Sequence, residues 1–299
     1  LSKLLGINPR GSKSDFSPIY ADLAASAQDI LESCILKLAK ESNKLSGLNK
    51  LAMAGGVALN GKANGNILKE SIFEDLFVTP ASADDGTAVG AALWVAEQNG
   101  FKVDKNYQTR NIYLGNSYSP KCCSEAVEES GFEFEELNLK SIQDKVADLL
   151  SKGNVIGWFQ DAAEFGPRAL GNRSILADPR KGFMKDLINS KIKFREPFRP
   201  FAPSVMEEYA SDYFEGNLKN AIYMNQIFKV NTEKRDQIPA VVHLDGTARV
   251  QIVSIKDNPK YHGLLNQFYK KTGIPILVNT SFNVKGEPIV ETPQNAINC

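Results

Sequence analysis

The chain has 299 residues, 42% of them hydrophobic, and its 35 basic residues balance 35 acidic residues. This length predicts about two domains, and this composition predicts a globular protein with a substantial core. A balanced charge argues against bulk attraction to nucleic acid or to a membrane surface, so we expect small-molecule substrates and neither of those partners.

Helical and strand patterns alternate along the first hundred or so residues. Apolar residues recur at helical spacing over residues 15–44, which predicts one long helix. A short buried strand is expected at 50–54, a loop and helix at 57–69, and another strand at 73–78. Residues 86–98 are small and apolar almost all round, which predicts a buried helix. Strand–glycine–helix alternation of this kind is typical of an α/β fold.

A polar linker rich in Gly, Asn and Ser is expected next, roughly over residues 100–120. Beyond it, helices are expected at 141–151, 183–193 and 261–272, and strands at 155–159, within 241–255 and at 275–279. The second half is therefore predicted to be α/β as well.

Cysteine, histidine and hydropathy patterns indicate the compartment. The four cysteines match neither a zinc motif nor a disulfide framework, which favours reduced thiols, and two histidines are few for a metalloenzyme. No apolar run reaches the roughly 18 residues of a membrane span, and the first ten residues do not form a signal peptide. We expect a cytoplasmic protein. Because the chain lacks an initiator Met and stops soon after an amphipathic stretch begins, we also expect it to be part of a longer one.

Two turns in the first half carry groups suited to a nucleotide. Gly55 and Gly56 follow a predicted strand and begin the run GGVALN, where glycine lets a backbone approach a phosphate closely. A tight turn without a ligand explains this motif equally well. Asp84 and Asp85 stand at the next strand-to-helix turn, where carboxylates cap a helix or bind a hard cation that bridges phosphates.

The strongest signal is a cluster of cations in the second half. Residues 166–200 hold nine Lys or Arg and three acids, interleaved with Gly, Pro and Phe in the motifs EFGPRALGNRS (164–174) and REPFRPFAP (195–203). Rigidly held arginines suit bidentate binding of phosphate or carboxylate. Buried salt bridges and a nucleic-acid site are the alternatives, but several buried arginines would each need a partner, and the net charge is zero.

A polar cluster is predicted where the last strand ends. The motif NTSFN at 279–283 places amides and hydroxyls at a strand terminus, where open α/β sheets bind ligands, although Asn and Ser also simply form turns.

In their order along the chain, GGVALN, the Asp84–Asp85 turn and the motifs at 164–174, 195–203 and 279–283 resemble the O-carbamoyltransferase family of nodulation proteins and antibiotic carbamoylation enzymes. The resemblance implies that residues 1–112 are the second half of an actin/Hsp70-like transfer domain. It further implies a linker at 113–137 and a mixed-sheet, YrdC-like α/β domain at 138–299. It implies an enzyme that makes carbamoyl-adenylate from carbamoyl phosphate and ATP and passes the carbamoyl group to an acceptor hydroxyl.

The family's metal-binding histidines lie in the half of the transfer domain that this chain lacks. We therefore expect residues 1–299 to be incomplete for transfer, with Asp84 as the one matching ligand for a divalent iron or magnesium ion. A threonylcarbamoyl-adenylate or hydrogenase-maturation enzyme is the nearest alternative, but the acylphosphatase and zinc-finger segments that would mark it are not found. A nucleotide- or anion-binding module without turnover is the other.

These patterns and the resemblance together nominate the site residues. The predicted catalytic residues are Arg168, Arg173, Lys193, Arg195 and Arg199. The predicted substrate-binding residues are Gly166, Gly171, Asn172, Ser174, Arg249, Asn279, Thr280, Ser281 and Asn283. The predicted nucleotide-binding residues are Gly55, Gly56, Asn60 and Asp85, with Asp84 at the metal.

Overall fold

The computed structural model describes residues 2–11, 17–70, 72–102 and 111–299. The chain forms two compact units, one ending at Gly47 and the other running from Leu48 to Cys299. The fold is mixed α/β, as predicted, and the second unit contains all its strands in the described residues.

The first unit is essentially one long helix. A short helix α1 (Ser2–Leu5) precedes α2 (Pro18–Ser46), which begins after Ser17 with proline in its first turn. The predicted helix at 15–44 is confirmed over its described part, since residues 15 and 16 lie outside the described residues. Only Ile35 and Ala39 of α2 are buried. None of the described helices is long and apolar enough to cross a membrane.

The second unit opens with two parallel strands and the helices that follow them. Strand β1 (Lys50–Met53) pairs in parallel with β2 (Asp75–Val78). Between them lie a 3₁₀ turn and helix α3 (Gly61–Lys69). Because the strands are parallel, the turns that follow both of them meet at one edge. β1 was expected to be buried, but its side chains are half-buried or exposed in alternation.

Helix α4 (Thr87–Gln98) forms where a buried helix was predicted, but none of its residues is buried. Leu93 is 50% exposed and Trp94 is 63% exposed. An all-round apolar helix predicts burial only if other elements cover it. The expectation of burial is therefore wrong for the described residues.

Side-chain amides tie the β1–β2 region to the rest of the second unit. Asn64 on α3 donates to the Asn225 carbonyl at 2.7 Å, and Asn225 donates to the Val78 carbonyl at 2.7 Å. Gln226 donates to the Leu76 carbonyl at 3.0 Å. All three amides are buried, and losing one partner would leave a buried polar group unpaired.

The main sheet of the second unit has five strands in the order β3-β4-β9-β5-β8. β9 is antiparallel to both β4 and β5, β3 is antiparallel to β4, and β8 is parallel to β5. The bounds are β3 (Ile156–Phe159), β4 (Arg173–Ala177), β5 (Ala202–Met206), β8 (Gln251–Val253) and β9 (Ile276–Ser281). The predicted strands β3, β8 and β9 are confirmed, whereas β4 and β5 were not predicted.

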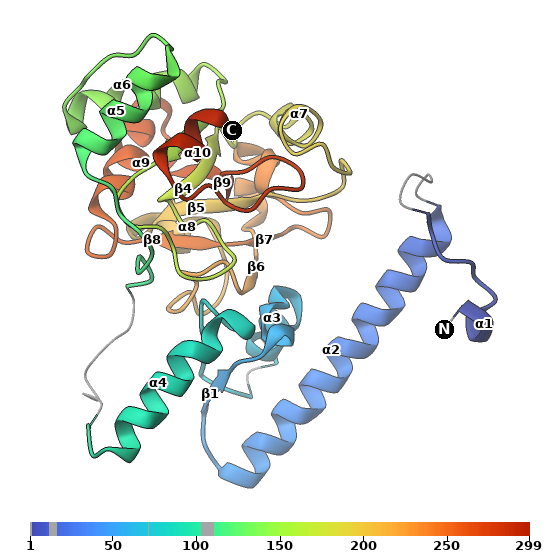
Figure 1. The fold of residues 1–299 in the computed structure, drawn as a ribbon. Coiled ribbons are helices and arrows are strands. Elements are labelled where there is room, and N and C mark those ends of the chain that lie inside the picture. Colours follow the sequence, from blue (N-terminus) through green and yellow to red (C-terminus); the bar gives the residue numbers. More distant parts are fainter. Residues whose placement is uncertain (1, 12–16, 71, 103–110) are drawn as a thin grey trace. The chain divides into compact units, whose positions relative to one another are not determined.

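Helices α6 (Leu139–Ser151) and α9 (Pro259–Thr272) lie side by side at the sheet (Figure 1). Both were predicted. Leu150, Leu264 and Leu265 join residues of β5 and β9 in one apolar core. This core fixes the strands whose ends carry the predicted site.

Smaller elements complete the second unit. They are α7 (Phe183–Lys191), α8 (Ala210–Tyr213), a hairpin of β6 (Ile227–Lys229) and β7 (Thr247–Arg249), and α10 (Pro293–Asn298). Part of the predicted linker at 113–137 is helical, because α5 (Pro120–Ser130) forms there and packs against α10. The predicted domain boundaries themselves stay a prediction.

We predict that Leu150→Ala lowers the free energy of unfolding by about 2–5 kcal/mol, because it leaves a cavity between α6 and the sheet. Leu150 is 0% exposed, whereas Leu139 on the same helix is 45% exposed. Leu139→Ala is therefore the matched control and should cost within about 0.5 kcal/mol. Chemical denaturation measures both values. Equal losses in the two variants would mean that α6 does not pack as described.

Candidate functional site

Residues 164–174, which we call the arginine-rich loop, fold around one carboxylate. Glu164 Oε1 accepts hydrogen bonds from the backbone N–H of Leu170 at 2.6 Å, of Asn172 at 2.8 Å and of Arg173 at 3.2 Å. A carboxylate that accepts several backbone N–H groups holds a turn firmly. Glu164 was not among the predicted site residues. It is the first residue of the motif EFGPRALGNRS, and that position is the signal that could have identified it.

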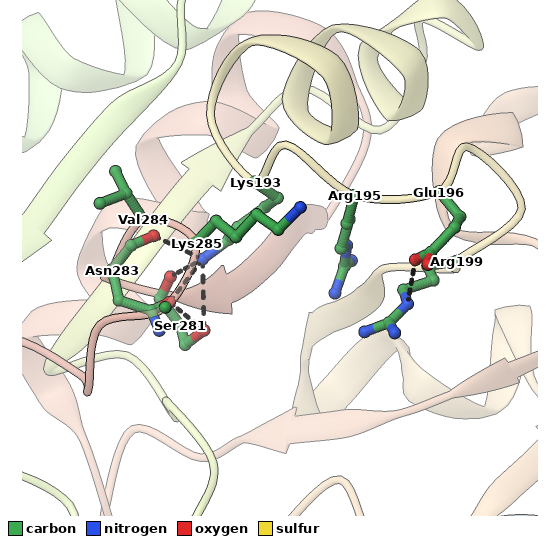
Figure 2. A pocket seen from close by; sticks show the side chains of 9 residues that line it. Lys193, Arg195, Glu196, Arg199, Ser281, Asn283, Val284 and Lys285 are labelled. Atoms are coloured by element: carbon green, nitrogen blue, oxygen red, sulfur yellow. Dashed lines mark hydrogen bonds and ion pairs between the residues drawn. The ribbon is translucent and has the colours of Figure 1, made fainter. Parts of the chain in front are cut away.

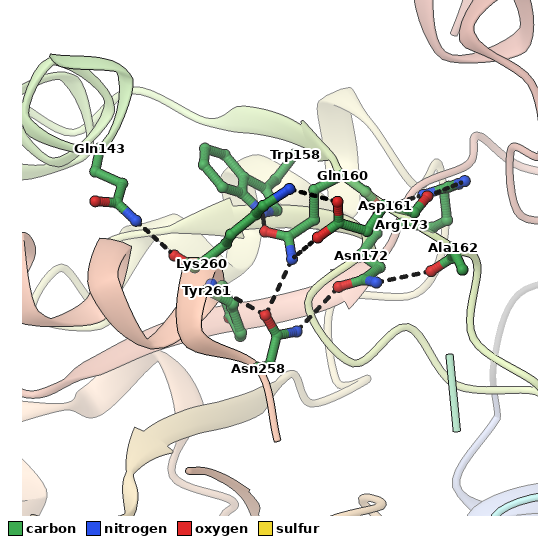
Figure 3. A network of polar contacts seen from close by, with 10 residues as sticks. All are labelled: Gln143, Trp158, Gln160, Asp161, Ala162, Asn172, Arg173, Asn258, Lys260 and Tyr261. Carbon is green, nitrogen blue, oxygen red and sulfur yellow. Dashed lines mark hydrogen bonds and ion pairs between the residues drawn. The ribbon is translucent and has the colours of Figure 1, made fainter. Parts of the chain in front are cut away.

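Arg173 holds this loop from inside (Figure 3). Its side chain is 0% exposed, and its guanidinium lies 3.6 Å from the centre of the Phe159 ring. Its terminal nitrogens donate to four backbone carbonyls, those of Asn116, Gln160, Asp161 and Asn172. Both terminal nitrogens of Arg173 thus have backbone partners, whereas its Nε is buried without a hydrogen-bond partner in the described residues. Its catalytic role stays a prediction.

Three predicted substrate-binding residues, Asn172, Ser174 and Gly171, also contact other residues of the protein. Asn172 donates to the Ala162 carbonyl at 2.7 Å and accepts from Asn258 at 2.9 Å, as Figure 3 shows. Ser174 Oγ accepts from the Gly171 N–H at 3.0 Å. A side chain at Gly171 would collide with Tyr261, since an ideal Cβ would lie 2.3 Å from its ring. These residues support the shape of the site.

Lysine and arginine side chains line a first cavity of about 280 Å³ (Figure 2), which we call the lysine cavity. Its lining comprises Lys193, Arg195, Glu196, Arg199, Ser281, Asn283, Val284, Lys285 and Gly286. Lys193 Nζ donates to the carbonyls of Ser281 and Asn283 at 2.5 and 2.9 Å, and to Asn283 Oδ1 at 2.7 Å. Burial, and then the charge of Arg195, lower the pKa of Lys193 to about 8.

Arg195 stands between the lysine cavity and a neighbouring one. Its Nε donates to Asn189 Oδ1 at 2.7 Å, and its guanidinium lies 4.7 Å from the centre of the Phe201 ring. Burial, and then the charge of Arg199, lower its pKa. Arg199 is more exposed and pairs with Glu196 at 2.9 Å. Of these two predicted catalytic residues, only Arg195 lines both cavities.

The neighbouring cavity, about 100 Å³, is lined by three arginines, and we call it the arginine cavity. Arg168, Arg195 and Arg249 share this lining with Asn279, Thr280 and Ser281, and the described lining residues include no carboxylate. The Nε atoms of Arg168 and Arg249 are buried without a hydrogen-bond partner in the described residues.

Burial and neighbouring positive charges both disfavour the charged form of Arg249. Burial, and then the charges of Arg168 and Arg195, lower its pKa. An arginine keeps its proton at physiological pH, so the lowered pKa reports a guanidinium charge that is disfavoured first by burial and then by its two neighbours. A bound anion would stabilise that charge. The sequence placed these arginines in one site, and the structure brings them together from the loop at 164–174, the segment before β5, and β7.

Arg168 also lines a third cavity of about 310 Å³. Glu164, Gly166, Arg168 and Arg173 line it together with residues from segments near 115 and 290. The predicted binding residue Gly166 therefore lies at a cavity. It also lies against the β1–β2 region, since an ideal Cβ at Gly166 would be 2.8 Å from the Pro80 carbonyl oxygen.

The predicted nucleotide residues gather at the carboxyl edge of β1 and β2. The Gly55 N–H donates to the Ser82 carbonyl at 2.6 Å, which joins the glycine turn to the turn that carries Asp84 and Asp85. Gly55 has a φ of 96°, a conformation that favours glycine. Its N–H is thus paired with a backbone carbonyl, and its contact with a nucleotide stays a prediction.

Other side chains at this edge have local roles. Asn60 Oδ1 accepts from the Ala63 N–H at 3.1 Å and caps α3. Nothing described lies within 4 Å of an ideal Cβ at Gly56, and Asp84 and Asp85 are exposed. The described residues hold no group of three or more His, Cys, Asp or Glu that could bind a metal. The described residues therefore do not by themselves form a metal centre at Asp84.

We predict that the lysine cavity binds sulfate and that sulfate affinity falls as the pH rises through the pKa of Lys193, about 8. Sulfate keeps its charge in this range, so the change reports the protein. One lost proton can cost up to about 1.4 kcal/mol per pH unit. Calorimetric titration at several pH values measures the decline, and Lys193→Met should remove most of it.

The same lowered pKa has the opposite effect on stability without an anion. Above about pH 8 the folded protein has released the Lys193 proton, while the unfolded chain still holds it. The free energy of unfolding therefore rises with pH until the ordinary lysine pKa is reached.

The Lys193→Met variant tests which group titrates in sulfate binding. If the pH dependence of sulfate affinity is unchanged in this variant, the titrating group is not Lys193.

Comparison with known proteins places this chain in one family. The model of the carbamoyltransferase N-terminus matches residues 6–93, and that of the carbamoyltransferase C-terminus matches residues 147–299. Nodulation protein NolNO of Sinorhizobium fredii is 41% identical over 98% of this chain and 44% of its own length. Nodulation protein NolO of Bradyrhizobium diazoefficiens is 41% identical over 98% of this chain and 54% of its own length.

The chain spans about half the length of these relatives. A solved structure of full-length HypF, in the phosphate- and nucleotide-bound form, is similar over 56% of this chain and 20% of that chain. At 16% identity and a TM-score of 0.37, this likeness carries no argument. The two family models, which together match the glycine edge and the cationic cavities, show that the chain belongs to the carbamoyltransferase family.

Proposed function

We propose that the C-terminal part of this chain forms carbamoyl-adenylate from carbamoyl phosphate and ATP, and that the whole protein transfers the carbamoyl group to an acceptor hydroxyl. The proposal keeps the predicted YrdC-like character of residues 138–299 and the predicted actin-like character of residues 1–112. ATP and carbamoyl phosphate are the proposed small-molecule partners.

The observation that carries the proposal is a pair of adjoining cationic cavities. The arginine cavity and the lysine cavity share Arg195 and Ser281. The first offers three guanidinium groups to one anion, and the second adds Lys193, Arg199 and Lys285. Two adjoining sites for anions suit a reaction between two phosphate compounds, because positioning both reactants removes much of the entropic barrier.

The reaction can be written with its atoms balanced. Water releases phosphate from carbamoyl phosphate and leaves a carbamate, whose oxygen then attacks the α-phosphorus of ATP and expels pyrophosphate. In this scheme Arg168 and Arg249 hold the phosphate of carbamoyl phosphate, and Arg195 spans both reactants. Lys193 stabilises the charge that develops on the phosphoryl oxygens of ATP.

Lys193 is suited to this role because it is held and desolvated. Its ammonium is fixed by oxygen atoms of Ser281 and Asn283, and it is only 6% exposed. A charge in such surroundings acts more strongly on a reacting phosphate than the same charge in water. An incoming triphosphate would also favour the protonated form of Lys193.

The transfer step is proposed for the edge of β1 and β2, where Gly55, Gly56, Asn60 and Asp85 would contact a nucleotide. Gly166 and Pro80 bring this edge next to the arginine-rich loop. A divalent metal at Asp84 stays a prediction for the whole protein, and no step is derived through it.

We predict that Lys193→Met lowers the rate of carbamoyl-adenylate formation about 10²–10³-fold, the usual loss when one transition-state donor is removed. Lys191→Met is the matched control, because Lys191 is exposed at the end of α7. Mass spectrometry detects carbamoyl-adenylate, and a coupled assay measures pyrophosphate release with ATP and carbamoyl phosphate present.

Two outcomes would contradict the proposal. Equal rates in the two variants would remove Lys193 from the reaction. Calorimetric binding of phosphate without any carbamoyl-adenylate from the unmodified chain would instead describe an anion-binding module that does not turn over.

A further inference from the structure

A buried amide cluster behind the arginine cavity has no role in the scheme above. It consists of Gln251 on β8, Ser204 on β5 and Asn279 on β9, and none of these side chains is more than 2% exposed. Asn279 alone among them lines the arginine cavity. Buried amides are costly unless they are paired, so the direction in which each one points has physical consequences.

One backbone carbonyl fixes the orientation of the cluster. Gln251 Nε2 donates to the Leu170 carbonyl at 2.7 Å. A carbonyl oxygen can only accept, so the Gln251 amide must turn its Oε1 the other way. That oxygen accepts from Ser204 Oγ at 2.5 Å and from Asn279 Nδ2 at 2.8 Å.

Asn279 is thereby oriented as well. Its Nδ2 also lies 3.1 Å from Ser204 Oγ and 3.3 Å from the Ala169 carbonyl oxygen. Ser204 uses its proton on Gln251, so it can only accept from Asn279. The Nδ2 group is therefore surrounded by acceptors, and Asn279 Oδ1 remains as the atom that this side chain can offer to a ligand.

Asn279 Oδ1 is buried and receives no hydrogen bond within the part of the chain that the structure describes. An unpaired buried acceptor destabilises the protein and calls for a donor. In a carbamoyl phosphate complex, the phosphate would meet the arginines and the acyl group would extend beyond it. The amine of a carbamoyl group donates hydrogen bonds, whereas the methyl of an acetyl group cannot.

We propose that Asn279 Oδ1 accepts a hydrogen bond from the carbamoyl amine and so selects carbamoyl phosphate over acetyl phosphate, with Gln251 and Ser204 as positioning residues. This inference rests on the proposed function. The arginines cannot make this distinction, because both compounds present the same phosphate to them. Selectivity against a methyl group needs a fixed acceptor, and an amide that is free to flip would offer its NH₂ group instead.

The test is a comparison of two stable phosphonates by calorimetry. Phosphonoacetamide carries the amide of carbamoyl phosphate, and acetonylphosphonate carries a methyl ketone of nearly the same shape. The unmodified chain should bind phosphonoacetamide on the order of tenfold more tightly, the value of one hydrogen bond to a buried acceptor. A ratio of one in the unmodified chain overturns the inference.

The variants separate positioning from packing. Gln251→Met keeps the volume but releases the Asn279 amide, and Asn279→Leu removes the acceptor, so each should bring the affinity ratio close to one. Gln143→Met is the matched control, because Gln143 is also buried and donates to a backbone carbonyl, that of Lys260 at 2.8 Å, without lining the arginine cavity. The control should retain the full ratio, since a loss of stability alone changes both affinities together.

Further outcomes are equally decisive. If Gln251→Met does not fold, Asn279→Leu still tests the acceptor, and an unchanged affinity ratio in Asn279→Leu overturns the inference. Selective phosphonate binding without carbamoyl-adenylate formation leaves this inference standing and refutes the proposed function. Adenylate formation with equal affinity for the two phosphonates refutes this inference and leaves the proposed function standing.

Discussion

The constraint on which the second unit depends is the burial of three guanidinium groups in one cavity. Arg168, Arg195 and Arg249 line it, and no described carboxylate lines it with them. Each group must be held by contacts that do not cancel its charge. Arg195 is held by a neutral amide and an aromatic ring. Glu196, the acid whose charge acts on Arg195, lies in the lining of the lysine cavity and pairs with Arg199 at 2.9 Å. The arginine cavity therefore keeps its positive charge, because no described carboxylate lines it.

The sequence predicted most helices and about half of the main sheet, and the misses have physical causes. The long helix, α3, α6 and α9 carry apolar residues at helical spacing, which depends on local sequence alone. β4 and β5 are buried along their whole length, so they lack the alternation that marks a half-buried strand. β4 also begins at an arginine, and β5 contains a proline. α4 was predicted as a helix, but its exposure depends on elements that contact it, which periodicity cannot report.

The candidate site was predicted at the level of segments and not at the level of roles. Arg168 and Arg173 stand in the same motif and look alike in the sequence. One contributes to two cavities, and the other donates to backbone carbonyls from residues 116 to 172. That difference arises from which distant segments cover each side chain. Gln251 and Ser204 belong to no recognisable motif, because their importance comes only from pairing across β5 and β8.

The two halves of the proposed chemistry meet in one short loop. Gly166 lies against the Pro80 carbonyl, and two residues later Arg168 enters the arginine cavity. Glu164 and Arg173 hold the loop that contains both residues. The buried amides of residues 225 and 226 hold the β1–β2 region. An anion bound by Arg168 would therefore stabilise the segment that touches the turn after β2. Because this coupling runs through packed backbone and not through a flexible linker, occupancy of the cavity and the conformation of the Pro80 turn should be thermodynamically linked.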